Sequence, residues 1–285
     1  MPGILYAIAT PIGNLEDITF RAVRILREEV SIIACEDTRQ TRKLLDRYEI
    51  RKALISYHEH NEKDRAQQIV VSLERGENVA LISDAGTPLV SDPGYRVVKA
   101  AIEAGFNVVP VPGPSAILAA LIGSGLATDE FRFIGFLPSK TGARRKVLAS
   151  ILNETATVVA YESPHRILET LAEMRELYGE RPIVLAREMT KMHEEFLRGS
   201  TGEILKQFQS RPSVKGEITL VIGRPEEASA KTNDPATEVL KLQREEGLDR
   251  MEAVKAVAKR FGLPKREVYR LAAAPDNSRA GRRHH

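Results

Sequence analysis

The chain has little cysteine and no long hydrophobic run. Its 285 residues contain one cysteine, Cys35, which excludes an internal disulfide framework and is typical of a reducing compartment. No apolar run approaches the ~20 residues that a membrane-spanning helix needs, and the N-terminus lacks a signal-peptide pattern. The composition, 42% hydrophobic and 28% charged, is ordinary for a globular protein. We expect a soluble, cytoplasmic protein with no membrane partner.

Common phosphate-binding and metal-binding motifs are also absent. Neither G-x-x-x-x-G-K-[ST] nor G-x-G-x-x-G occurs, so the sequence does not support a phosphate cradle. His58 and His60 flank Glu59, but the helical H-E-x-x-H spacing is missing and Cys35 is the one soft ligand available. We therefore expect no metal site and interpret this run as cleft lining.

Charge is distributed unevenly along the chain. Residues 231–285 hold 13 Lys and Arg against 8 Asp and Glu, a net charge of +5, which leaves the first 230 residues at −2. This split indicates that the C-terminal part meets a negatively charged partner. Residues 276–285 end in Arg-Arg-His-His and are expected to be a disordered tail, left by cloning, outside the fold.

The first part of the chain alternates apolar, β-rich runs with amphipathic segments, which predicts an α/β domain over residues 1–120. Alternation of this kind is typical of a mostly parallel sheet with helices on both faces. The expected strands are 4–9, 32–34, 79–82 and 108–111, and the expected helices are 18–29, 38–48, one from an Asn61 N-cap to Gly76, and one between the last two strands.

A second α/β domain is predicted over residues 121–224, with at least one antiparallel pairing because its alternation is looser. The expected strands are 131–136, 157–161, 183–186, 196–197 and 217–222, and the expected helices are 143–152, 164–178 and 201–209. Residues 225–235 are polar and predict a linker.

Residues 236–275 predict a small helical domain that resembles a helix-turn-helix. Ala258, Gly262 and Val268 fall where such a motif places a small residue, a turn glycine and an apolar residue, and Pro264 suits the start of the second helix. A basic group surrounds the turn and is predicted to bind RNA: Lys259, Arg260, Lys265, Arg266 and Arg270. The alternative is an amphipathic helical cap with a solvated basic face.

Three predicted strand exits are rich in glycine and proline. They are 9–14 (ATPIGN), 83–94 (SDAGTPLVSDPG) and 112–116 (PGPSA). Glycine permits close backbone approach and proline stiffens the turn, and open parallel sheets bind ligands at this edge. Any one loop could be an ordinary tight turn, but three on one edge predict a rigid ligand pocket.

These loops resemble the tetrapyrrole (corrin/porphyrin) methylase family over about residues 1–224. Within that family, several segments are similar to the bacterial 16S ribosomal RNA cytidine 2′-O-methyltransferases: 35–39 (CEDTR), 58–62 (HEHNE), 135–138 (GFLP), 161–166 (YESPHR), 187–191 (REMTK) and 215–217 (KGE). Porphyrin-modifying relatives have a glycine-rich first loop and a later Gly-Asp-Pro run, which here are residues 10–14 and Gly86-Thr87-Pro88. That departure argues against a tetrapyrrole substrate.

The resemblance implies S-adenosylmethionine, held in a cleft between the two α/β domains, as well as a homodimer and a 16S rRNA substrate in the small ribosomal subunit. The cofactor contacts that it implies are Pro11, Ile12, Gly13, Asp84, Ala85, Gly86, Thr87, Val90, Ser115, Ala116, Glu162, Met189 and Gly216. The rival interpretations are a methylase of a small tetrapyrrole precursor and a non-enzymatic nucleic-acid-binding protein.

Methylation of a ribose hydroxyl needs positioning, a proton acceptor and a cation near the developing oxyanion. The candidate catalytic residues are Glu36, Asp37, Arg39, His58 and Glu188. For Asp37, capping of the following helix is an equally good interpretation. The candidate RNA contacts in the α/β part are Arg42, Lys43, Arg144, Arg145, His165, Arg166, Arg187 and Lys191. Inter-domain ion pairs, or a solvated helix start near Arg144, are the alternatives.

Overall fold

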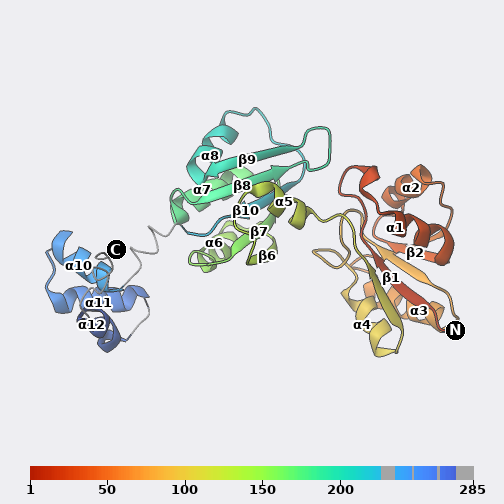
Figure 1. Ribbon diagram of the computed structural model, residues 1–285, viewed down its shortest axis with the longest axis horizontal. Helices are drawn as coiled ribbons and strands as arrows, with labels where there is room; N and C mark the ends of the chain where they lie inside the picture. Colours follow the sequence, from red (N-terminus) through yellow and green to blue (C-terminus); the bar gives the residue numbers. More distant parts are fainter. Residues whose placement is uncertain (226–234, 246, 262–263, 274–285) are drawn as a thin grey trace, which may run out of the picture. The chain divides into compact units, whose positions relative to one another are not determined.

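The computed structural model describes residues 1–225, 235–245, 247–261 and 264–273, and the chain divides into two compact units after Arg224 (Figure 1). Among the described helices, none has the length and apolar character needed to cross a membrane. The two α/β sheets lie in the first unit and the basic helices lie in the second.

The first sheet is parallel throughout, as the alternation predicts. Its strands are β1 (Ile4–Ile8), β2 (Ile32–Cys35), β3 (Ala53–Ser56), β4 (Val79–Ile82) and β5 (Asn107–Val111), in the order β3-β2-β4-β1-β5. The sequence interpretation missed β3, because this edge strand is short and no residue in it is fully buried. It therefore lacks the continuous apolar run that marks a central parallel strand.

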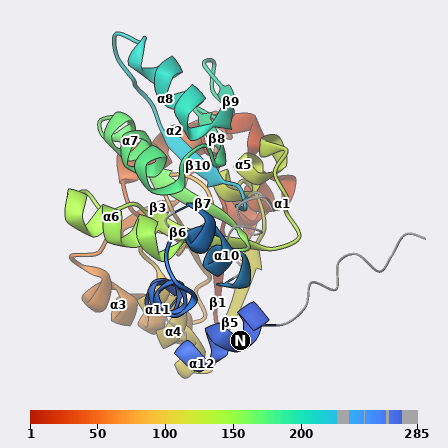
Figure 2. The same cartoon turned by 90° about the vertical axis from the view of Figure 1, so that its left-hand side faces the viewer.

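Helices cover both faces of this sheet because buried strand residues alternate between them. Ala80 and Ile82 face α1 (Phe20–Arg24), the π-helix η2 (Ile25–Glu29) and α2 (Thr38–Arg47). Val79 and Leu81 face α3 (Glu62–Glu74) and α4 (Tyr95–Glu103), which lie side by side (Figures 1 and 2).

The helix expected over 18–29 starts later, at Phe20. The Thr19 hydroxyl caps this helix by accepting a hydrogen bond from the Ala22 amide at 3.1 Å. A short 3₁₀ turn, η1 (Leu15–Asp17), precedes the helix.

The second sheet is mixed, so the expected antiparallel pairing is confirmed. Its strands are β6 (Phe131–Phe136), β7 (Thr157–Glu162), β8 (Pro182–Arg187), β9 (Glu195–Ser200) and β10 (Ile218–Ile222), in the order β6-β7-β10-β8-β9. Only β6 and β7 are parallel among these neighbours.

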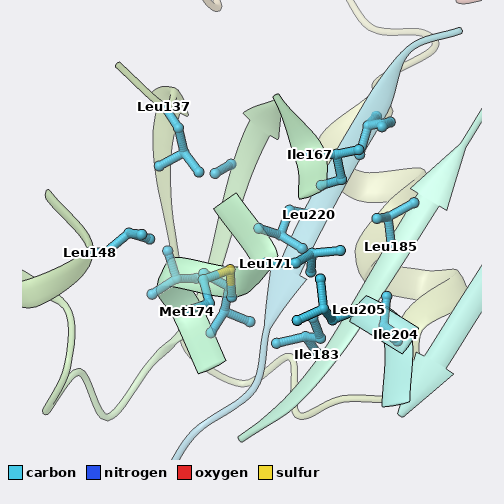
Figure 3. Packing of buried hydrophobic residues seen from close by; sticks show 14 of the residues in the cluster. Leu137, Leu148, Ile167, Leu171, Met174, Ile183, Leu185, Ile204, Leu205 and Leu220 are labelled. Atoms are coloured by element: carbon cyan, nitrogen blue, oxygen red, sulfur yellow. The ribbon is translucent and has the colours of Figure 1, made fainter. Parts of the chain in front are cut away.

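One face of the second sheet carries the largest buried cluster, shown in Figure 3. Side chains of α7 (Ile167–Tyr178) and α8 (Thr201–Gln209) meet strand residues such as Leu185 and Leu220 there, and Leu148 of α6 (Thr141–Ser150) joins them. The opposite face is covered by α5 (Ala116–Ser124) through Ile117, Ala120 and Leu121. The boundary expected after residue 120 falls inside this helix.

The second unit is built from α10 (Pro235–Glu245), α11 (Arg250–Phe261) and α12 (Lys265–Ala273). Val239, Val254, Val257 and Val268 are buried against one another, and Ala258 is buried among them. Pro264 directly precedes α12, as expected. Most of the expected linker, the turn residue Gly262 and the tail 276–285 lie outside the described residues.

Candidate active site

The three glycine- and proline-rich loops leave neighbouring strands, because β1 lies between β4 and β5. The loops are also bonded to one another. The Thr10 amide donates to the Gly86 carbonyl oxygen and the Gly86 amide to the Thr10 carbonyl oxygen, both at 2.9 Å. The Thr87 hydroxyl donates to the Pro114 carbonyl oxygen at 3.3 Å. The loops therefore form one rigid edge.

A cavity of about 390 Å³ opens at this edge and is closed by residues of the second sheet. That volume lies within the range of small-molecule sites. Eleven of the residues expected at a cofactor line it: Ile12, Asp84, Ala85, Gly86, Thr87, Val90, Ser115, Ala116, Glu162, Met189 and Gly216. The two others, Pro11 and Gly13, do not line the cavity, because Pro11 is buried beneath the loop and Gly13 faces the side chains of Thr190 and Lys191.

Two loops of the wall hold non-glycine residues in the left-handed region. Leu89 and Ser91, at φ 70° and 65°, flank Val90, and Glu188 and Thr190, at φ 51° and 65°, flank Met189. Each such residue costs on the order of 1–3 kcal/mol, and strained backbone of this kind clusters at ligand clamps and active sites. In both loops the residue between the strained pair lines the cavity.

Sequence reasoning missed nine lining residues: Ser91, Asp92, Phe136, Tyr161, Ser163, Pro164, Glu217, Ile218 and Thr219. The sequence partly indicated these residues, because Phe136, Tyr161 and Glu217 lie in the motif segments that carry the family resemblance. Their placement depends on β6, β7 and β10 being neighbours. Strand order across an edge is a long-range property that local pattern does not reveal.

The cavity wall is acidic. Burial and the nearby carboxylates of Glu36 and Asp84 together raise the pKa of Asp92 to about 6, although a hydrogen bond from the Ser83 hydroxyl opposes them. The pKa of Asp84 is also raised, mainly by burial. Among the residues that the structure describes, no Lys or Arg lines this wall. A ligand with positive charge is therefore favoured over a phosphate.

The carboxylate of Glu162 is used within the protein. It is buried and accepts hydrogen bonds from the Ser163 amide at 2.6 Å, the Thr170 hydroxyl at 2.6 Å and Arg166 Nη2 at 2.9 Å. These bonds fix the start of α7 against the cavity. Glu162 thus shapes the wall and has little capacity left to bind a ligand.

The candidate catalytic residues of the β2 exit lie beside the cavity but not in its wall. The Asp37 amide donates to Asp84 Oδ1 at 2.9 Å, which ties this exit to the wall. Asp37 caps α2 by accepting from the Arg39 amide, and its ion pair with Arg39 lowers its pKa to about 2. The capping interpretation of Asp37 is therefore confirmed, and so low a pKa makes it a weak proton acceptor.

Glu36, His58 and Glu188 have separate surroundings. Burial and nearby Asp84 raise the pKa of Glu36. His58 Nδ1 is buried without a hydrogen-bond partner, and its Nε2 lies 3.2 Å from Asn61 Nδ2. Glu188 accepts from Lys191 Nζ at 2.8 Å and from the Glu217 amide at 3.0 Å, so it braces the wall. Within the described ranges, no group of three or more His, Cys, Asp or Glu residues is arranged to hold a metal ion.

Arg144 is the clearest correction among the expected RNA contacts. Its side chain is 0% exposed and donates from Nε and Nη2 to both carboxylate oxygens of Glu173, at 2.9 and 2.8 Å. A guanidinium held in this way cannot reach RNA. The prediction was wrong because a basic run at a helix start indicates charge but not which member turns inward.

The other expected cations of the first unit are exposed to different degrees. Arg42, Lys43 and His165 are exposed. Four others form ion pairs: Arg145 with Glu176, Arg166 with Glu162, Arg187 with Glu195, and Lys191 with Glu188 and Glu217. In the second unit, Lys265, Arg266 and Arg270 are exposed on α12, and Lys259 and Arg260 belong to α11.

Comparison with known proteins identifies the family of the chain. Residues 4–205 match the family described as tetrapyrrole (corrin/porphyrin) methylases. A protein of Synechocystis sp. named ribosomal RNA small subunit methyltransferase I is 45% identical, over 95% of this chain and 97% of its own length. The protein of that name from Halalkalibacterium halodurans is 44% identical, over 94% of each chain.

A solved structure shares the fold. Uroporphyrin-III-C-methyltransferase from Thermus thermophilus superposes with a TM-score of 0.53 at 20% identity, over 80% of this chain and 98% of that one. Since this identity is low, the likeness extends to the fold alone. The family match and the close relatives together show that the chain belongs to the tetrapyrrole (corrin/porphyrin) methylase family and is an S-adenosylmethionine-dependent methyltransferase.

Proposed function

We propose that the chain methylates the 2′-hydroxyl of a cytidine ribose in the 16S rRNA of the small ribosomal subunit. The observation that carries this proposal is the near full-length similarity to proteins named ribosomal RNA small subunit methyltransferase I. The basic, exposed α12 is consistent with an RNA partner. A homodimer and a cytoplasmic location, which the resemblance implies, belong to the same proposal.

The cavity fits S-adenosylmethionine, which when bound supplies a methyl group activated by a sulfonium centre. Ile12, Val90 and Met189 offer apolar contact, and Asp84 and Asp92 offer carboxylates to a cationic ligand. Gly86 has a φ of +81°, and a Cβ on it would lie 3.4 Å from Ile12 Cγ2. The bare backbone at Gly86 therefore leaves room for a ligand against the loop.

Asp92 is the proton acceptor that the geometry favours over the candidates predicted from sequence. It lines the cavity, whereas Glu36, Asp37, His58 and Glu188 do not. A pKa of about 6 leaves its carboxylate ionised at neutral pH and more basic than an ordinary aspartate. In this proposal Glu36 keeps the pKa of Asp92 high through its charge, and Asp37 and Glu188 hold the wall in place.

Phosphates of the RNA must remain outside the cavity, because its described wall has carboxylates and no Lys or Arg. Exposed cations such as Arg42, Lys43 and His165 are the proposed phosphate contacts of the first unit. A single nucleoside then enters the acidic cavity. Enzymes that act on a base within a duplex extrude that nucleotide, and the proposal extends this solution to a ribose hydroxyl.

The direct test of the proposed function is methyl transfer from labelled S-adenosylmethionine to small ribosomal subunits that lack the modification. We expect label in a dinucleotide that survives alkaline hydrolysis, because a 2′-O-methyl group removes the attacking hydroxyl. Label on a base, or in a subunit protein, would contradict the proposal. The same assay with free 16S rRNA shows whether the assembled subunit is required.

The basic face of α12 is expected to contribute affinity for RNA without affecting the cofactor. Replacing Lys265, Arg266 and Arg270 by Glu should weaken RNA binding at least tenfold and reduce the slope of log K against log salt, since fewer counterions are released. Filter binding at several salt concentrations measures both effects. Calorimetry with S-adenosylmethionine is the control, and an equal loss of cofactor binding would contradict a separate RNA-binding unit.

A further inference from the structure

Phe136 is a large apolar side chain that lies exposed in the wall of the cavity. Phe136 is 61% exposed, whereas the wall residues Ile12, Met189 and Glu162 are buried. It belongs to β6, the edge strand of the second sheet. Neither the proposed cofactor contacts nor the proposed proton acceptor involves this ring. Leaving it in water costs hydrophobic free energy that a ligand can recover.

A β-bulge places Phe136 in the cavity. Phe133 pairs with Val159 and Phe136 pairs with Tyr161, so three steps along β6 match two steps along β7. Without the extra residue, Phe136 would face the opposite side of the sheet from Phe133, because strand side chains alternate. Gly135, at φ +72°, takes the left-handed conformation at the bulge.

The bulge also builds an aromatic stack. The ring centroids of Phe136 and Tyr161 lie 5.1 Å apart, and those of Phe133 and Tyr161 lie 5.0 Å apart at an interplanar angle of 67°. Tyr161 therefore contacts both rings, and Phe136 is the most exposed of the three. The stack presents a supported aromatic surface at the cavity, with carboxylates near it. Burial raises the pKa of the Tyr161 hydroxyl, and the charges of Asp92 and Glu217 raise it as well.

We infer that Phe136, supported by Tyr161, is the stacking platform for the base of the nucleotide that is methylated. The inference rests on the proposed function. A base that leaves an RNA must approach from outside, so an exposed ring at an edge strand suits it better than the buried contacts of the cofactor loops. Aromatic faces are the usual receptors for unstacked RNA bases. A base seated there brings its own ribose to the side of the cavity that holds Asp92.

Phe136→Ala is expected to reduce kcat/KM for small subunits by about five- to 150-fold, the range for loss of one base–aromatic stack. Phe136→Trp should restore most of the activity. S-adenosylmethionine affinity, measured by calorimetry, should stay unchanged. The matched control is Phe131→Ala, because Phe131 lies on the same strand, is 45% exposed and does not line the cavity.

An abasic nucleotide at the methylated position gives the sharper test. Subunits reconstituted with this rRNA keep the 2′-hydroxyl and lose the stacking partner, so wild type and Phe136→Ala should act on them at equal rates. A persisting difference in rate between the two proteins, or weaker cofactor binding by Phe136→Ala, would contradict the role of Phe136 as a stacking platform. The ring would then contact another partner. Failure of the wild type to methylate rRNA at all would instead remove the proposed function, which separates the two outcomes.

Discussion

Asp92→Asn should lower kcat by about 10²- to 10⁴-fold, the usual contribution of a general base. The amide keeps the size and shape of the side chain but cannot accept the proton of the ribose hydroxyl. The fold should not suffer, because the raised pKa shows that the site favours the neutral side chain. Single-turnover methyl transfer to small subunits measures the loss, and thermal unfolding is the accompanying check on the fold.

The pH dependence gives an independent readout of the same residue. Because Asp92 must be ionised to accept a proton, the rate should fall about tenfold per pH unit below a midpoint near pH 6 and level off above it. Glu36→Gln should move that midpoint downward, since removing its charge eliminates a contribution that raises the pKa of Asp92.

Asp84→Asn is the matched control for the pH profile. Asp84 also lines the cavity and has a raised pKa, but its carboxylate is bonded to the Asp37 amide. We expect this variant to keep the acidic limb, with a midpoint that moves down less than in Glu36→Gln, because Asp84 contributes less than Glu36 to the raised pKa of Asp92. If Asp92→Asn retained the limb or most of its activity, another group would be the base.

The sequence alone predicted the edge of the first sheet where the pocket lies, and the reason is physical. Parallel strands place their carboxyl ends at one edge, so three glycine- and proline-rich exits predicted a shared pocket before their order was known. The structure adds that β1 lies between β4 and β5. The edge strand β3 was missed because its partly exposed residues give no strong pattern.

The other wall of the cavity was not predictable from local pattern. Phe136 and Tyr161 meet only because β6 pairs with β7 through a bulge, and the sequence signature of a bulge is a single glycine. Asp92 lay within a loop already recognised, but its raised pKa arises first from burial, then from Glu36 on another segment and from Asp84 near the start of the same loop. Burial in the folded protein and the charge of a residue distant in sequence therefore decide which carboxylate becomes basic.

Local sequence pattern also failed to show that Arg144 stabilises the fold. The run from Lys140 to Lys146 is basic, and exposure was the natural expectation for all of it. Instead Arg144 turns inward, bonds both carboxylate oxygens of Glu173 on α7 and also reaches Glu169 at 3.1 Å. The pair joins α6 to α7 across the core of the second sheet.

Arg144→Ala is therefore expected to lower the free energy of unfolding by about 3–5 kcal/mol, because it leaves the Glu173 carboxylate buried without its partner. Urea unfolding followed by circular dichroism measures the change. Arg145→Ala is the control, since the Arg145–Glu176 pair is exposed and such pairs contribute only about 0–1 kcal/mol.

Replacing both Arg144 and Glu173 distinguishes the cost of burying an unpaired charge from the loss of packing. Arg144→Met combined with Glu173→Met removes both charges and keeps apolar volume, so most of the lost stability should return. RNA affinity of the folded Arg144→Ala protein should match that of wild type, because the buried guanidinium has no surface to offer. A variant with unchanged stability and weakened RNA binding would restore Arg144 to the RNA-binding surface, and would mean that the α6–α7 ion pair opens when RNA binds.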